Sequence, residues 1–144
     1  EIIKAENADS EIDKLGQITI ANQVVVDNRY DTPETLRFDS TASIKLINYK
    51  ANHLTYESIS STDQFAVFSE IFYDKGWNAY IDGESVPHVR GNYVLRAMTI
   101  PSGSHTVEFK FEPSTYYTGE KISLASSSIL ILMLIFVLYK ELKR

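Results

Sequence analysis

Apolar and polar residues alternate along the middle of the chain. In SHTVEFKFEP, residues 104–113, the side chains of Val107, Phe109 and Phe111 lie on one face, and the residues between them are polar. A period of two is typical of a β-strand that buries one face and leaves the other in water. This segment predicts a strand of an antiparallel sheet.

Earlier segments predict more strands. SIKLINYK (43–50) and HLTYESIS (53–60) are separated by only two residues, which indicates a hairpin. QFAVFSEIF (64–72) is apolar on both faces, which predicts a central strand. The residues expected to be buried in it are Phe65, Val67, Phe68 and Ile71.

A second hairpin is predicted around Asp82-Gly83. WNAYID and ESVPHV flank this dipeptide, and a type I′ turn needs positive φ at both central positions, which Asp-Gly supplies. NYVLRAMTI (92–100) is predicted as the next strand, followed by a turn at residues 101–103. About seven short strands at roughly ten-residue spacing favour an antiparallel β-sandwich of the jelly-roll or immunoglobulin-like kind over residues 43–115.

The first 42 residues have a different pattern. A short apolar run, a helix-like NADSEIDKLGQ and a second apolar run, NQVVVDN, predict a small αβ segment that ends in a linker at residues 30–33. The chain begins at Glu1 without a methionine or a basic signal-peptide region. We therefore expect it to be the C-terminal part of a longer protein or a processed product.

The C-terminal region is almost entirely apolar. Residues 122–139 contain no charge over eighteen positions, and a helix of that length rises about 27 Å, close to the ~30 Å hydrocarbon core of a bilayer. Tyrosines at both ends are typical of a membrane interface. These observations predict a transmembrane helix at 122–139 preceded by an interfacial linker at 116–121; the alternative is a core helix of a larger soluble protein. The predicted interface residues are Tyr116, Tyr117, Tyr139, Lys140, Lys143 and Arg144.

Charge predicts the orientation of this helix. Residues 1–120 carry 18 acidic and 10 basic side chains, a net charge of −8, whereas residues 140–144 carry three basic side chains and one acidic. Because basic flanks face the cytoplasm, the β-rich domain is expected outside it. Small residues in the outer third of the helix, including Ser123 and Ala125, favour contact with neighbouring transmembrane helices.

The composition excludes several kinds of chemistry. The chain has no cysteine, hence no disulfide or thiolate site, and the sequence contains no Gly-rich phosphate loop or nucleophile elbow. The acidic balance argues against nucleic acid as a partner. His53, His88 and His105 lack a second ligand at metal spacing and are expected to be surface or packing residues. No cofactor is predicted.

Three carboxylates, Asp74, Asp82 and Glu84, raise the alternative of an acid/base pair for glycoside chemistry. The turn explains Asp82, and Glu84 opens the returning strand, so a structural role is favoured. Candidate contacts with a glycan or partner are Trp77, Tyr80, Arg90 and Tyr93.

Trp77 shares one strand face with Ala79 and Ile81, whereas Tyr80 lies on the other, which favours Trp77 as a core anchor over a sugar platform. Arg90 and Arg96 flank Gly91-Asn92. They are candidates for contact with an anionic lipid or partner, and surface charges are the favoured interpretation.

Several longer strings carry a family resemblance. FSEIFYDKGWNAYIDG, RGNYVLRAMTIPSG, HTVEFKFEP and YYTGEKIS closely resemble the C-terminal region of the YfhO-type bacterial membrane proteins, as found in Bacteroidetes. The resemblance covers residues 43–144. Residues 1–39 look like the less distinctive preceding segment of that family.

The resemblance implies a large polytopic protein whose N-terminal helices are similar to GT-C glycosyltransferases, which use polyprenyl-phosphate sugars on the outer face of the membrane. It implies a role in glycosylating cell-envelope polymers such as lipoteichoic acid. Bacteroidetes lack lipoteichoic acid, so the acceptor stays open. The catalytic acidic residue of such enzymes lies in an early loop that has no counterpart in this chain.

These observations favour a non-catalytic extracytoplasmic domain and last transmembrane helix of a YfhO-like membrane glycosyltransferase. The expected partners are the lipid bilayer, other transmembrane helices of the parent protein, and an envelope glycan or lipid-linked sugar. The alternatives are a membrane-anchored carbohydrate-binding or adhesion module without enzymatic activity, and a structural or assembly role.

Overall fold

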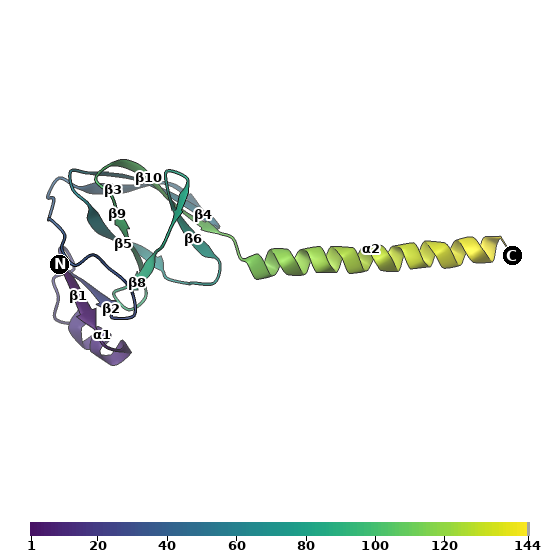
Figure 1. Ribbon diagram of the computed structural model, residues 1–144, viewed down its shortest axis with the longest axis horizontal. Helices are drawn as coiled ribbons and strands as arrows, with labels where there is room; N and C mark the ends of the chain where they lie inside the picture. Colours follow the sequence, from purple (N-terminus) through teal and green to yellow (C-terminus); the bar gives the residue numbers. More distant parts are fainter. Residues whose placement is uncertain (144) are drawn as a thin grey trace. The chain divides into compact units, whose positions relative to one another are not determined.

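The computed structural model describes residues 1–143 and divides into two units, Glu1–Phe111 and a second one that begins at Glu112. The first unit, called the sandwich unit below, contains two five-stranded sheets (Figure 1). In spatial order the first sheet contains β1 (Ile2–Ala5), β2 (Val24–Asp27), β8 (Val89–Gly91), β9 (Leu95–Ile100) and β5 (Gln64–Ile71). The second contains β3 (Ser43–Lys50), β4 (His53–Ser60), β10 (Gly103–Phe111), β6 (Trp77–Ile81) and β7 (Glu84–Val86).

The predicted sandwich is confirmed, and its core lies between the two sheets. Phe68, Met98 and Ile100 come from the first sheet, whereas Leu54, Ala79, Val107 and Phe109 come from the second, and all seven are buried. Edge-to-face ring contacts join the layers: the ring centroids of Phe68 and Phe109 are 4.8 Å apart, and those of Tyr56 and Phe68 are 4.9 Å apart. Such pairs add about 0.5–1.5 kcal/mol each beyond the burial of their area.

The hairpin of β3 and β4 has the predicted bounds, and β10 alternates as predicted. The ESVPHV segment, by contrast, is divided between the sheets: β7 ends at Val86 in the second sheet, and β8 begins at Val89 in the first. Pro87 lies at the division. Proline has no N–H to donate to a β-ladder, so the chain can pass from one sheet to the other at this residue without losing a backbone N–H bond to a neighbouring strand.

The strand predicted at residues 92–100 begins three residues later, at Leu95. Asn92 and Tyr93 have positive φ values of 48° and 70° and form a turn between β8 and β9. Because side chains are strained at positive φ, the turn needs local support. The Asn92 side chain provides it by accepting a hydrogen bond of 2.9 Å from the Val25 N–H.

The prediction that residues 64–72 form a central strand is wrong. β5 is the edge strand of its sheet, and Ile71, expected to be buried, is 71% exposed. The pairing of β5 with β9 shifts register between Phe68 and Ile71. An irregularity of this kind turns the following side chain away from the core. Phe68 is buried as expected.

The N-terminal segment joins the first sheet. β1 and β2 pair in parallel, connected by α1 (Ala8–Leu15), whose N-cap Asn7 accepts a hydrogen bond of 2.9 Å from the Ser10 N–H. Figure 1 shows these elements grouped beside β8. β2 meets β8 through Val26 and Gly91. A Cβ at Gly91 would lie 3.2 Å from Val24 Cγ2 on β2, so the absence of a side chain permits this close approach.

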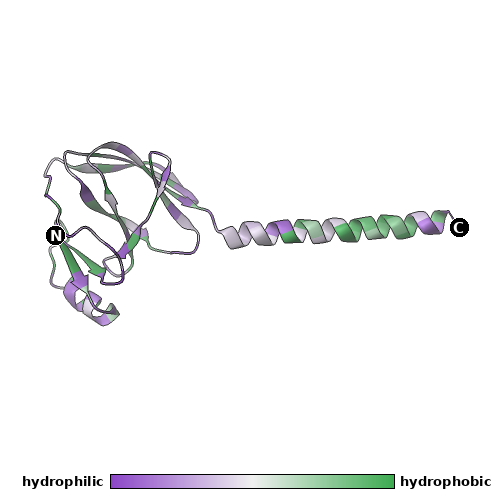
Figure 2. Cartoon of the chain, in the orientation of Figure 1, coloured by the Kyte–Doolittle hydropathy of each residue, from purple (hydrophilic) through white to green (hydrophobic). Residues whose placement is uncertain are grey.

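The second unit consists mainly of α2 (Ser114–Leu142). Its 29 residues rise about 44 Å, the thickness of a bilayer including its headgroup regions. It contains the predicted span at 122–139, and Figure 2 shows its apolar residues concentrated in the half nearer the C-terminus. The hydroxyls of Ser126 and Ser128 donate to the carbonyls of Ile122 and Leu124, so these polar groups are satisfied within the helix.

Candidate functional site

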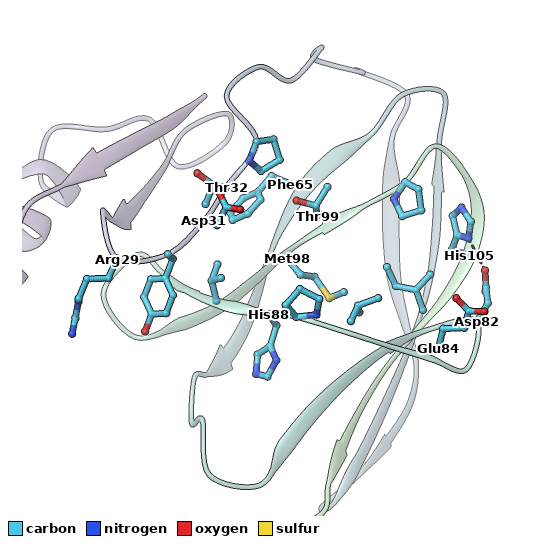
Figure 3. A pocket seen from close by; sticks show the side chains of 17 residues that line it. Arg29, Asp31, Thr32, Phe65, Asp82, Glu84, His88, Met98, Thr99 and His105 are labelled. Atoms are coloured by element: carbon cyan, nitrogen blue, oxygen red, sulfur yellow. Dashed lines mark hydrogen bonds and ion pairs between the residues drawn. The ribbon is translucent and has the colours of Figure 1, made fainter.

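A cleft of about 1070 Å³ opens in the sandwich unit (Figure 3). Its walls come from the linker that follows β2, the hairpin of β6 and β7, the crossing from β7 to β8, and strands β5 and β9. Binding sites for small molecules are typically concave, with volumes of roughly 300–1,000 Å³ and a mainly apolar lining. The seventeen lining residues are Arg29, Tyr30, Asp31, Thr32, Pro33, Phe65, Ile81, Asp82, Glu84, Val86, Pro87, His88, Val89, Met98, Thr99, Pro101 and His105.

The hairpin wall of the cleft is held by Asp82. Asp82 and Gly83 have φ values of 51° and 87°, so both central positions of the predicted type I′ turn are confirmed. The Asp82 carboxylate accepts a hydrogen bond of 2.8 Å from the Thr106 N–H, and its other oxygen lies 2.6 Å from His105 Nδ1. The bond with His105 lowers the pKa of Asp82, and the bond with Asp82 raises the pKa of His105.

The linker wall begins with an ion pair that engages the lining residue Arg29. Arg29 binds the carboxylate of Asp27 through two nitrogens at 3.0 and 2.9 Å. The side-chain bond to Arg29 lowers the pKa of Asp27, although the burial of Asp27 acts in the opposite direction. Further along, the Thr32 hydroxyl is buried and has no hydrogen-bond partner among residues 1–143.

His88 lines the cleft, but its ring is directed elsewhere. In Figure 3 the ring points away from the other labelled side chains, and it packs against Phe72 and Phe109 at centroid distances of 5.4 and 5.8 Å. Burial lowers the pKa of His88. Burial favours the neutral form of an imidazole, and a neutral ring packed against aromatic rings is typical of a packing histidine. Within residues 1–143, no group of three metal-binding side chains is found.

Two of the predicted contact residues, Arg90 and Tyr93, hold the N-terminal segment to the sandwich. The carboxylate of Glu11, which is completely buried, accepts bonds of 2.8 Å from Arg90 Nη2 and from the Tyr93 N–H. Arg90 also lies over the Tyr93 ring, 5.5 Å from its centroid. A buried carboxylate with a charged partner and a backbone donor is well compensated.

The other two predicted contact residues, Trp77 and Tyr80, lie on opposite faces of β6. Trp77 packs against the core, 5.4 Å from the Phe111 ring, whereas Tyr80 is covered by Lys110, whose Nζ lies 4.8 Å from its ring centroid. Arg90 and Tyr93 thus lie together beside Glu11, Trp77 and Tyr80 lie on opposite faces of β6, and none of the four is among the seventeen residues that line the cleft.

Arg96 is buried, so its interpretation as a surface charge is wrong. Its side chain is on the inner face of β9, where the guanidinium lies 4.0 Å from the Trp77 ring centroid and Nε donates to the Ile71 carbonyl at 3.0 Å. The residue is 3% exposed, and burial lowers its pKa. Stacking on an aromatic ring is one of the few ways to stabilise a desolvated guanidinium.

Of the three carboxylates considered for acid/base chemistry, Asp82 and Glu84 line the cleft and Asp74 does not. Asp82 is already bonded to His105 and Thr106. Sequence reasoning recognised residues 30–33 only as a linker, and it gave no reason to associate Asp31 or Thr32 with Phe65 and Thr99. These positions are separated by more than thirty residues along the chain, and only the sheet topology brings them to one cleft.

The predicted interface residues lie near the ends of α2. Tyr116 and Tyr117 occupy its first turn, where their N–H groups donate to the Pro113 carbonyl. At the other end, Lys143 Nζ lies 5.6 Å from the centroid of the Tyr139 ring, and Lys140 is in the last turn. Arg144 lies outside the described residues. Within residues 1–143, α2 is the one helix long and apolar enough to cross a membrane, and none of its side chains is buried.

The two units thus define a class: a β-sandwich domain joined in one chain to an exposed apolar helix of bilayer length. The model of the family described as "Bacterial membrane protein YfhO" matches residues 21–123, and the chain belongs to this family. The predicted resemblance is confirmed.

A distant relative supports the same assignment. The uncharacterized protein YfhO of Bacillus subtilis (strain 168) is 24% identical over 112 residues, which cover 77% of this chain. These residues span only 13% of the relative's own length. No solved structure matches the chain. The protein is therefore a bacterial membrane protein of the YfhO family, with α2 as its candidate transmembrane helix.

Proposed function

We propose that this chain is the non-catalytic extracytoplasmic domain and last transmembrane helix of a cell-envelope glycosyltransferase that uses polyprenyl-phosphate sugars. The observation that carries the proposal is the extent of the family match, because residues 21–123 run through the sandwich and into the first part of α2. The family unit therefore includes both a water-facing domain and the start of an apolar helix. An enzyme that meets lipid-linked sugars at the outer face of a membrane needs this combination.

In this proposal the sandwich unit lies outside the cytoplasm of a bacterial inner membrane, and residues 140–144 lie inside it. The net charge of −8 before residue 121 and the basic residues after residue 139 support this orientation. The hydrocarbon core surrounds residues 122–139, residues 116–121 lie at the interface, and α2 contacts other transmembrane helices of the parent protein. The catalytic residues belong to parts of that protein outside this chain.

The orientation can be tested with single cysteines, because the native chain has none. Asp74 is exposed on the sandwich unit, and Leu142 is 88% exposed at the far end of α2. A membrane-impermeant maleimide should label Asp74→Cys on intact spheroplasts and Leu142→Cys only after permeabilisation. The reverse pattern would contradict the orientation.

The enzymatic role is tested by the composition of the envelope. Deletion of the gene should remove one sugar substituent from an envelope polymer, as measured by mass spectrometry. The full-length gene should restore that substituent, and a version lacking residues 1–111 should not. An unchanged glycan composition in the deletion strain would rule out the glycosyltransferase role.

The second candidate function is a membrane-anchored carbohydrate-binding or adhesion module without enzymatic activity. The cleft favours it, because an open concave site on an anchored domain is sufficient for binding. In that case the deletion strain would keep its glycan composition and lose a binding property of the cell surface. The same strain therefore separates the two candidates.

A further inference from the structure

We propose that the cleft of the sandwich unit binds a short, uncharged oligosaccharide. This inference deepens the proposed function, on which it rests for the identity of the ligand as an acceptor glycan. The charge of the cleft, its apolar surface and the buried Thr32 hydroxyl support it.

The charges of the cleft disfavour an anion. Three carboxylates line it, whereas its only guanidinium among the described residues, that of Arg29, is bound through two nitrogens to Asp27. His105 is similarly bound to Asp82. A phosphate or uronate entering the cleft would approach carboxylates without a free cation, and like charges at close range are repulsive. A neutral ligand has no such cost.

The carboxylates that remain suit hydroxyl groups. Asp82 is occupied by Thr106 and His105, but Asp31 and Glu84 are exposed at the cleft, and Figure 3 shows them on opposite sides of Met98. An ionised carboxylate accepts strong hydrogen bonds from hydroxyl donors, each shorter than a bond between neutral groups. Two acceptors separated in this way favour a ligand that is longer than one ring and carries hydroxyls at both ends.

Between Asp31 and Glu84 the lining of the cleft is apolar. Phe65, Val86 and three prolines offer flat or rounded hydrocarbon surfaces, which complement the C–H faces of a sugar ring. The Thr32 hydroxyl is buried in the same wall without a partner. An unsatisfied buried hydroxyl is costly, so a ligand hydroxyl that gains access to it would be favoured. A lipid chain would meet the apolar surface but leave the carboxylates and this hydroxyl unpaired.

The test uses the whole chain in lipid nanodiscs, with maltotetraose, cellotetraose, mannotetraose and chitotetraose as neutral probes. Calorimetry and saturation-transfer NMR should detect at least one of them with a dissociation constant below about 1 mM, a common range for a single weak site. Asp31→Ala and Glu84→Ala should each weaken that binding about tenfold. Asp74→Ala, an exposed carboxylate outside the cleft, is the matched control and should bind as the wild type does.

Other outcomes would overturn the proposal. These are the absence of binding by all four neutral probes, unchanged affinity in both cleft variants, and tighter binding of the anionic tetragalacturonate. Preferential binding of octalysine would identify a site for a basic peptide instead. Because binding is measured on the isolated chain, its failure is distinct from failure of the enzymatic role, which is measured by the glycan composition of cells.

Discussion

In the sandwich unit Phe109 and Val107 are completely buried, whereas in α2 Leu134 and the other apolar residues are all exposed. The first unit removes its hydrophobic surface from water by packing two sheets against each other. The second has no internal core and depends on a surrounding apolar phase. The difference indicates that one chain is adapted to two solvents, and the change falls between Phe111 and the start of the uncharged run at Ile122.

The largest expected effect is a difference in stability when one apolar side chain in each unit is truncated to alanine. Phe109→Ala should destabilise the sandwich by about 3–5 kcal/mol, because the ring contacts Tyr56, Phe68 and His88. Leu134→Ala should leave the unfolding of the sandwich unchanged. Denaturant titration in detergent, followed by circular dichroism, checks both. Equal losses of stability would contradict the separation of the chain into two independently solvated units.

A charge in the middle of α2 tests directly whether lipid hydrocarbon surrounds this helix. Leu134→Arg should cost about 2.5–3.5 kcal/mol of membrane insertion free energy, because a guanidinium is poorly accommodated at the centre of a bilayer. The control is Tyr49→Arg on β3, where the native side chain is 66% exposed. Carbonate extraction of membranes should release a larger fraction of Leu134→Arg than of the wild type, and Tyr49→Arg should be released no more than the wild type. Full retention of Leu134→Arg would indicate that α2 lies outside the hydrocarbon core.

A third variant sharpens the comparison within the sandwich, which buries polar groups as well as apolar ones. Glu11→Gln should cost about 1.5–3 kcal/mol, since the Arg90 guanidinium would lose the nearer of its two buried ionic partners, the other being Asp27. Hydrogen exchange should show the largest increase at α1 and at the turn containing Tyr93. Glu57→Gln, at an exposed position, should have no effect. A uniform increase over the whole unit would mean that the N-terminal segment unfolds together with the sandwich.

The smallest expected effect is a pH dependence of the unfolding free energy that comes from the His105–Asp82 pair. The pKa of His105 is raised above its ordinary value of 6.5, so the stability from its charged form is fully present below that pH and is lost as pH rises through the raised pKa. The pKa of Asp82 is lowered below 3.8, so its contribution is lost only as pH falls through that lower pKa. The difference in unfolding free energy between the wild type and His105→Gln should therefore be largest between about pH 4 and 6.5. A difference that does not change with pH would show that the positive charge of His105 contributes nothing to stability.

Local chemistry made much of the fold predictable. The period-two pattern identified β3, β4 and β10, and Asp82-Gly83 identified its hairpin, because these features depend on neighbouring residues. The uncharged run at 122–139 was recognisable for the same reason. The exposure of Ile71 was missed, since it depends on a register shift between β5 and β9 that neither strand reveals alone.

The cleft could not be predicted, because its walls are assembled from distant segments. Val26 meets Gly91 across 65 positions, and this pairing brings the linker after β2 beside β8 and β9. Arg96 was misjudged for a related reason: its stabilising partners, Trp77 and the Ile71 carbonyl, come from other strands. A charged residue in a sequence is expected at the surface unless such partners are known.

The contact between Trp77 and Arg96 also has a practical consequence. Trp77 is the chain's single tryptophan, and its indole ring lies 4.0 Å from the Arg96 guanidinium at the edge of the sandwich core. Its ultraviolet emission therefore originates entirely in the sandwich and none of it in α2. The colour and quenching of that emission give a built-in optical signal for the state of the sandwich unit, readable on the purified chain in lipid without an attached dye.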